Sequence, residues 1–109
     1  MVKKLTNASL EDIMEALQGD NKTQELIANE TLRIGSLLVN KNKAYGNSAL
    51  EPVRIFSRAN SMEQLAVRID DKLSRLSRGH EYVGDDTLDD LVGYLVLLLV
   101  ARKRQKQDE

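Results

Sequence analysis

The chain has 109 residues, of which 16 are Lys or Arg and 17 are Asp or Glu, so its formal net charge is −1. A domain of this size can bury a core, although association with further copies would help it to cover apolar surface. Without a global positive charge, and with only 4% aromatic residues, the composition argues against nucleic acid as a partner. The absence of Cys excludes a disulfide framework and a thiolate metal site, and no signal peptide is evident at the start. We therefore expect a cytoplasmic protein.

Two helices are predicted in the N-terminal part of the chain. The first begins at Ser9, whose side chain would cap it, and ends near Gly19. The second runs from about Thr23 to about Lys41, because apolar residues recur there every three or four positions. Residues 43–48 break this period.

Two further helices are predicted in the middle of the chain. Ser48 has the character of a helix cap and Pro52 would lie in the first turn, so a short helix is expected through Phe56. Ser61 would cap the next helix, whose apolar face extends to Leu76.

The last predicted helix is apolar around nearly its whole circumference. It would be capped by Asp85 or Asp86 and would run to about Lys103. Its apolar run, from Leu91 to Ala101, is well short of the roughly 20 residues that cross a bilayer, so we expect a buried helix and no membrane partner. Because such a helix must be enclosed on every side, we expect a homodimer or a homotetramer.

No strand pattern, repeat or linker is present, so the expected fold is all-α. We expect residues 1–20 to form a short peripheral N-terminal helix and residues 21–109 to form a single helical-bundle domain.

Two charged stripes of opposite sign lie close together in the sequence. One consists of Arg68, Asp71, Lys72 and Arg75, and the other of Asp86, Asp89, Asp90 and Gly93. Both have the spacing i, i+3, i+4 and i+7, which is one face of a helix. Across a helical hairpin these stripes could hold a phosphorylated ligand with a divalent metal, or they could neutralise each other in a salt-bridge lattice. Both interpretations stay open.

A second candidate segment is Tyr45, Gly46 and Asn47. Tyr45 offers a stacking face and Asn47 offers hydrogen-bond donors and acceptors, although Gly and Asn also commonly follow a helix end. Tyr94 is either a ligand contact or a core residue. His80 has no second His or Cys beside it and is interpreted as a solvated loop residue.

Three motifs together resemble a known family. They are Lys41-x-x-x-Tyr45-Gly46-Asn47, Arg68-x-x-Asp71-Lys72-x-x-Arg75 and Asp86-Thr-Leu-Asp89-Asp90-Leu-x-Gly-Tyr94. They resemble the phage and bacterial family called nucleotide modification associated domain 1, which is similar to the all-α nucleoside triphosphate pyrophosphohydrolases of the MazG and dimeric dUTPase type. In those enzymes Glu-x-x-Glu and Glu-x-x-Asp motifs hold magnesium against the substrate phosphates. Here the second motif is present as Asp86-x-x-Asp89. Of the first motif, Asp71 is the single acidic residue present. Glu30 is a further carboxylate, but no sequence spacing places it beside Asp71.

The resemblance implies a MazG-like bundle that cleaves a nucleotide pyrophosphate bond with Mg²⁺. Asp86, Asp89 and Asp90 would then hold the metal, with Asp71, Asp86 and Asp89 as the catalytic residues. The nucleotide contacts would be Lys41, Tyr45, Asn47, Arg68, Lys72, Arg75 and Tyr94. Because the first acidic motif is missing, a non-catalytic phage protein that sequesters a host signalling nucleotide is the alternative. A structural bundle with an internal salt-bridge lattice is a third possibility.

Overall fold

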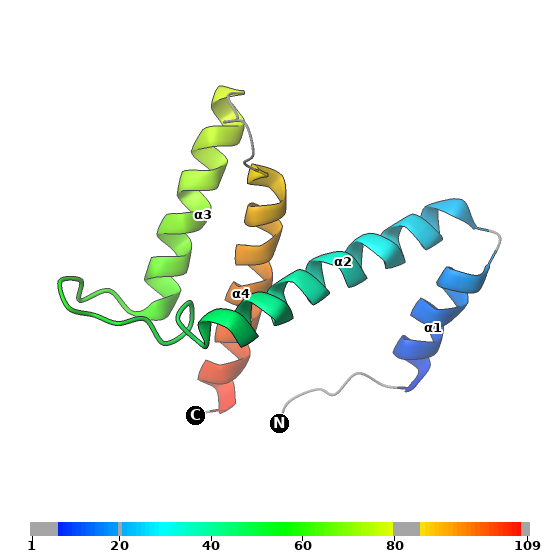
Figure 1. The fold of residues 1–109 in the computed structure, drawn as a ribbon, viewed down its shortest axis with the longest axis horizontal. Helices are drawn as coiled ribbons and strands as arrows, with labels where there is room; N and C mark the ends of the chain where they lie inside the picture. Colours follow the sequence, from blue (N-terminus) through cyan, green and yellow to red (C-terminus); the bar gives the residue numbers. More distant parts are fainter. Residues whose placement is uncertain (1–6, 20, 80–85, 108–109) are drawn as a thin grey trace. The chain divides into compact units, whose positions relative to one another are not determined.

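The structure is a computed structural model in which residues 7–19, 21–79 and 86–107 are described. It contains the helices α1 (Asn7–Gln18), α2 (Lys22–Tyr45), α3 (Ser61–Arg78) and α4 (Thr87–Gln107) (Figure 1). These described residues contain no strand, so for them the all-α prediction is confirmed. None of their helices is both long enough and apolar enough to span a bilayer.

The chain divides into two compact units, Met1–Asn40 and Lys41–Glu109. The first unit holds α1 and most of α2, and the second holds the end of α2 together with α3 and α4. The boundary that we predict between residues 20 and 21 falls in the interval between α1 and α2 and stays a prediction.

Asn21 and Gly46 mark the two ends of α2. The Asn21 side chain accepts a hydrogen bond from the Gln24 backbone N–H at 3.1 Å, which satisfies a donor of the first turn. At the other end, Gly46 has a φ of 68°, a left-handed conformation that glycine adopts readily after the last helical residue. The helix therefore continues past Lys41, the predicted end, and stops at Tyr45.

No helix forms over residues 48–56, so the short helix predicted there is wrong. The backbone N–H groups of Leu50 and Glu51 both donate to the Asn47 carbonyl, at 2.9 and 2.7 Å, which makes a single turn. Pro52 then disfavours the helical conformation of the residue before it. The proline therefore ends the turn at Glu51, whereas the sequence pattern predicts a proline in the first turn of a helix.

The caps of α3 lie at both of its ends. The Asn60 side chain accepts the Glu63 backbone N–H at 2.9 Å, so the cap is Asn60 and the prediction of Ser61 is wrong. Asn and Ser are about equally good caps, and their order along the chain does not decide between them. Gly79, with a φ of 69°, ends the helix, and its N–H donates to the Leu76 carbonyl.

α3 and α4 form an antiparallel hairpin, and within the described part of the chain they are the pair of helices that pack together (Figure 1). Lys72 contacts Asp90 and Arg68 contacts Tyr94, so earlier residues of α3 lie against later residues of α4. Leu65 of α3 is only 1% exposed. The hairpin is therefore the element that positions both charged stripes.

Candidate functional site

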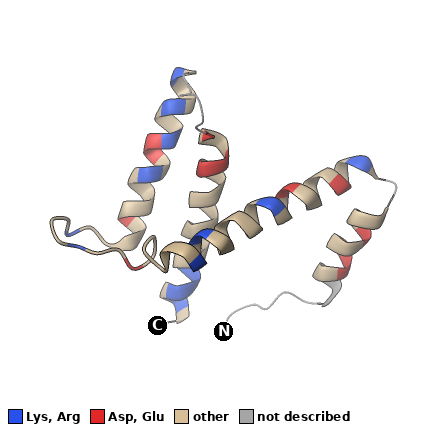
Figure 2. Cartoon of the chain, viewed as in Figure 1, with Lys and Arg blue, Asp and Glu red and all other residues tan. Residues whose placement is uncertain are grey.

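Arg68 and Lys72 of the α3 stripe lie on the side of the helix that meets α4. Figure 2 shows both basic and acidic positions along α3, whose last turn is basic, while the first turn of α4 is acidic. Arg68 and Lys72 both contact α4 side chains, which are Tyr94 and Asp90 respectively. The hairpin thus joins the two predicted stripes through Lys72 and Asp90.

Lys72 and Asp90 form the ion pair that joins the two helices. The Lys72 Nζ lies 3.1 Å from Asp90 Oδ2, and the side chains are 12% and 36% exposed. A lysine this well covered needs a nearby opposite charge, because transfer of an unpaired ammonium out of water is unfavourable. This pair is the contact that the salt-bridge interpretation predicts.

Arg75 and Arg68 occupy different surroundings from Lys72. Arg75 pairs with Asp71 on its own helix at 3.3 Å, and both side chains are largely exposed. The Arg68 guanidinium lies 5.8 Å from the centre of the Tyr94 ring, within the range of a cation–π interaction. Tyr94, which we predicted either as a ligand contact or as a core residue, is half-buried at the hairpin seam.

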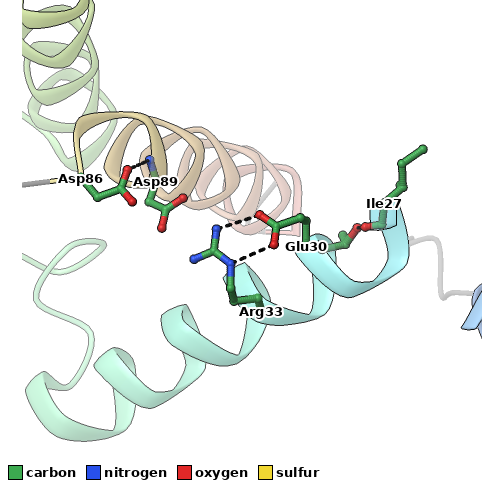
Figure 3. Close-up of polar contacts among 6 residues, drawn as sticks. Ile27, Glu30, Arg33, Asp86 and Asp89 are labelled. Atoms are coloured by element: carbon green, nitrogen blue, oxygen red, sulfur yellow. Dashed lines mark hydrogen bonds and ion pairs between the residues drawn. The ribbon is translucent and has the colours of Figure 1, made fainter. Parts of the chain in front are cut away.

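Asp86, which is one of the two predicted caps, is the N-terminal cap of α4. Its side chain accepts the Asp89 backbone N–H at 3.0 Å (Figure 3), and its carbonyl accepts the Asp90 N–H at 3.0 Å. The acidic side chains also lie at the positive end of the helix dipole, where negative charge is favourable. Asp86 therefore has a structural role that does not require a ligand.

The described carboxylates do not gather in a group of the kind that holds a metal ion. Over residues 7–19, 21–79 and 86–107 no group of three or more His, Asp or Glu side chains could hold a metal ion. Asp90 is paired with Lys72, and Asp89 and Asp90 are neighbours in sequence, so they point in different directions from the helix. The metal role predicted for Asp86, Asp89 and Asp90 gains no support here and stays a prediction. Asp85 and His80 lie outside the described residues.

The segment that contains Lys41, Tyr45 and Asn47 remains separate from the hairpin stripes. Asn47 accepts a hydrogen bond from the Asn42 side chain at 2.8 Å, and the same amide donates to the Gly46 carbonyl at 3.2 Å. Tyr45 and Lys41 are exposed. In the part of the chain that is described, no hydrogen bond, ion pair or ring contact joins these three residues to α3 or α4.

Glu30 is a further carboxylate, which no sequence spacing places beside Asp71, and it lies on α2. It accepts two hydrogen bonds from the Arg33 guanidinium, at 3.2 and 2.9 Å (Figure 3). This is an ion pair between neighbouring turns of one helix.

One long-range pair was not predicted from the sequence. The Arg104 guanidinium donates to Glu51 at 2.6 Å, which fastens the segment after α2 to the end of α4. The two residues are 53 positions apart, so no local periodicity could have revealed the contact.

Replacing Lys72 by Met should lower the free energy of unfolding by about 1 to 2 kcal/mol, because Asp90 would lose the cation that compensates its partial burial. Chemical denaturation of the variant measures this change. The control is Lys22→Ala, which removes a more exposed cation 3.7 Å from Glu25 and should change stability by less than about 0.5 kcal/mol. Equal effects of both substitutions would contradict a special role for the hairpin pair.

Comparison with known proteins finds no match to the chain among family models, curated proteins or solved structures. The fold and the site define it as an all-α protein with a charged antiparallel hairpin. Any more specific function is therefore inferred from the three sequence motifs and from the contacts described above.

Proposed function

We propose that the protein is a MazG-like helical protein that binds the phosphate groups of a nucleotide along the α3–α4 hairpin. The observation that carries the proposal is the row of Arg68, Lys72 and Arg75 on one side of α3, with Arg68 beside an aromatic ring. The resemblance to nucleotide modification associated domain 1 supports a nucleotide as the ligand.

The three cations suit different parts of such a ligand. The Arg68 and Arg75 guanidinium groups can each bind two phosphate oxygens at once, whereas a lysine acts as a point charge. The Arg75–Asp71 pair is exposed, and exposed pairs contribute little stability, so a phosphate can exchange with the carboxylate at small cost. Tyr94, next to Arg68, adds an aromatic surface of the kind on which a base stacks.

Binding without cleavage is the activity that these contacts support most directly. The cations would account for phosphate recognition, while the described residues contain no group of three or more acidic or His side chains that could hold a metal ion. This favours a protein that sequesters its nucleotide over a pyrophosphohydrolase. The competing function, Mg²⁺-dependent cleavage of a pyrophosphate bond, is favoured by the Asp86-x-x-Asp89 motif.

Removal of divalent metal should leave nucleotide affinity within about twofold of its original value, because charge-assisted contacts from Arg and Lys need no metal. The ligand is first sought by mass spectrometry of small molecules that co-purify with the protein. A panel of nucleotides is then incubated with the protein, with and without a chelator, and analysed by chromatography.

Recovery of intact nucleotide from both incubations supports sequestration. Release of pyrophosphate or a monophosphate by the wild type, lost in Asp89→Asn while binding persists, would establish the enzyme instead. Absence of binding across the whole panel would contradict both functions.

A further inference from the structure

One side of α4 exposes a continuous row of apolar side chains. We define the outer stripe as Leu88, Val92, Leu95 and Leu99, whose exposed fractions lie between 38% and 59%. Their spacing of four, three and four residues keeps them on one face of a helix with about 3.6 residues per turn. The residues that meet α3 or are buried, such as Asp90, Tyr94 and Ala101, fall on the opposite side. The hairpin therefore leaves this apolar row uncovered.

The charges of α4 are strongly polarised along its axis. Asp89 and Asp90 lie in the first turn, directly after the Asp86 cap, and Arg104 and Lys106 lie in the last turn (Figure 2). The outer stripe runs between these ends, and Arg102 continues it toward the basic end at the same helical spacing. The helix thus has an acidic end, an apolar middle and a basic end.

We propose that the outer stripe packs against the outer stripe of a second copy, with the two α4 helices antiparallel about a two-fold axis. Leu88 then lies opposite Leu99 of the partner subunit, and Val92 lies opposite Leu95 of the partner subunit. In an antiparallel pairing, all pairs of one register have the same sum of residue numbers. These two pairs have equal sums, so one register pairs the whole stripe. A self-complementary contact of this kind is what a two-fold axis requires.

The charge pattern selects the antiparallel arrangement. In this register the partner subunit's Arg102 comes within about one helical turn of Asp86 and Asp89. The basic end of each helix therefore meets the acidic end of the other, and the helix dipoles also oppose each other. A parallel pairing would place like charges together at both ends. The partner's cation would also reach the edge of the candidate site, although the pairing itself does not rest on the proposed nucleotide binding.

The need for such a partner follows from how little of the chain is buried. In the described residues the buried apolar side chains are Ala28, Ile34, Leu65, Leu91 and Ala101. Small chains bury a limited fraction of their surface, and association supplements that core. A second copy covers the outer stripe and brings opposite charge near both ends of α4.

Light scattering measures the mass of the wild type, which should be about twice that of the 12.3 kDa chain. Leu95→Glu places a carboxylate at the centre of the contact in both copies, so the dissociation constant should rise at least about 100-fold. The control is Val67→Glu on α3, where the wild-type side chain is 65% exposed, and it should remain dimeric. A monomeric wild type, or equal assembly of both variants, would overturn the proposal.

Crosslinking tests the register without an introduced charge. The chain has no Cys, so Leu88→Cys/Leu99→Cys carries the only thiols. These positions are about 16 Å apart along one helix but face each other across helices packed about 8 to 10 Å apart. A thiol reagent of about 8 Å should link position 88 of one copy to position 99 of the other, as peptide mass spectrometry reads directly. Links from 88 to 88, or no linked dimer, would refute the antiparallel pairing.

Discussion

Leu65→Ala should lower the free energy of unfolding by about 2 to 5 kcal/mol, the range for removal of a large side chain from a packed core. Leu65 is 1% exposed and lies inside the α3–α4 hairpin. Truncation there removes buried apolar surface and leaves a cavity that helices fixed by the hairpin cannot fully close. Urea denaturation at one fixed protein concentration measures the change, because association also contributes to apparent stability.

Val67→Ala provides the matched control for this prediction. It lies on the same helix two residues away, has nearly the same apolar character, and is 65% exposed. The substitution should change stability by no more than about 0.5 kcal/mol, as is usual for surface positions. A small effect at Leu65 would show that the hairpin interior is not packed as described.

Arg68→Ala/Arg75→Ala should weaken nucleotide binding at least about 100-fold. Each substitution removes one charge-assisted contact, worth roughly 1.5 to 3 kcal/mol, which is about tenfold or more in affinity. Unfolding free energy should change little, because Arg68 and Arg75 are both exposed and the ion pairs and cation–π contacts of exposed arginines contribute little stability. Calorimetric titration with the nucleotide identified from the panel measures the loss.

Arg54→Ala/Arg58→Ala is the control, since it also removes two exposed arginines, both from the segment between α2 and α3. Its affinity should equal that of the wild type, which separates a local effect from a change in net charge. If Arg68→Ala/Arg75→Ala melts at a much lower temperature than the wild type while neither protein binds any nucleotide, the stripes are a salt-bridge lattice and not a site.

Most of the helices could be predicted from the amino-acid sequence, because their signals are local. Apolar spacing placed the helices. Asp86, one of the two predicted caps, accepts a backbone N–H of the first turn of α4, and Gly46 follows the last residue of α2 in the left-handed conformation that glycine readily adopts. The stripe on α3 was likewise readable from the spacing of Arg68, Lys72 and Arg75. The failure over residues 48–56 was also local, since the restriction that Pro52 places on the preceding residue outweighed the capping signal.

Which charged side chains pair with each other could not be predicted from the sequence, because it depends on how the helices pack. Lys72 forms an ion pair with Asp90 across the hairpin, whereas Arg75 forms one with Asp71 on its own helix, although both cations belong to one stripe. Glu51 likewise meets Arg104 from 53 residues away. Periodicity specifies the face of a helix that a residue occupies but not the register of that helix against another. The register depends on how side chains such as Leu65 pack between α3 and α4, and that packing is a long-range property of the folded chain.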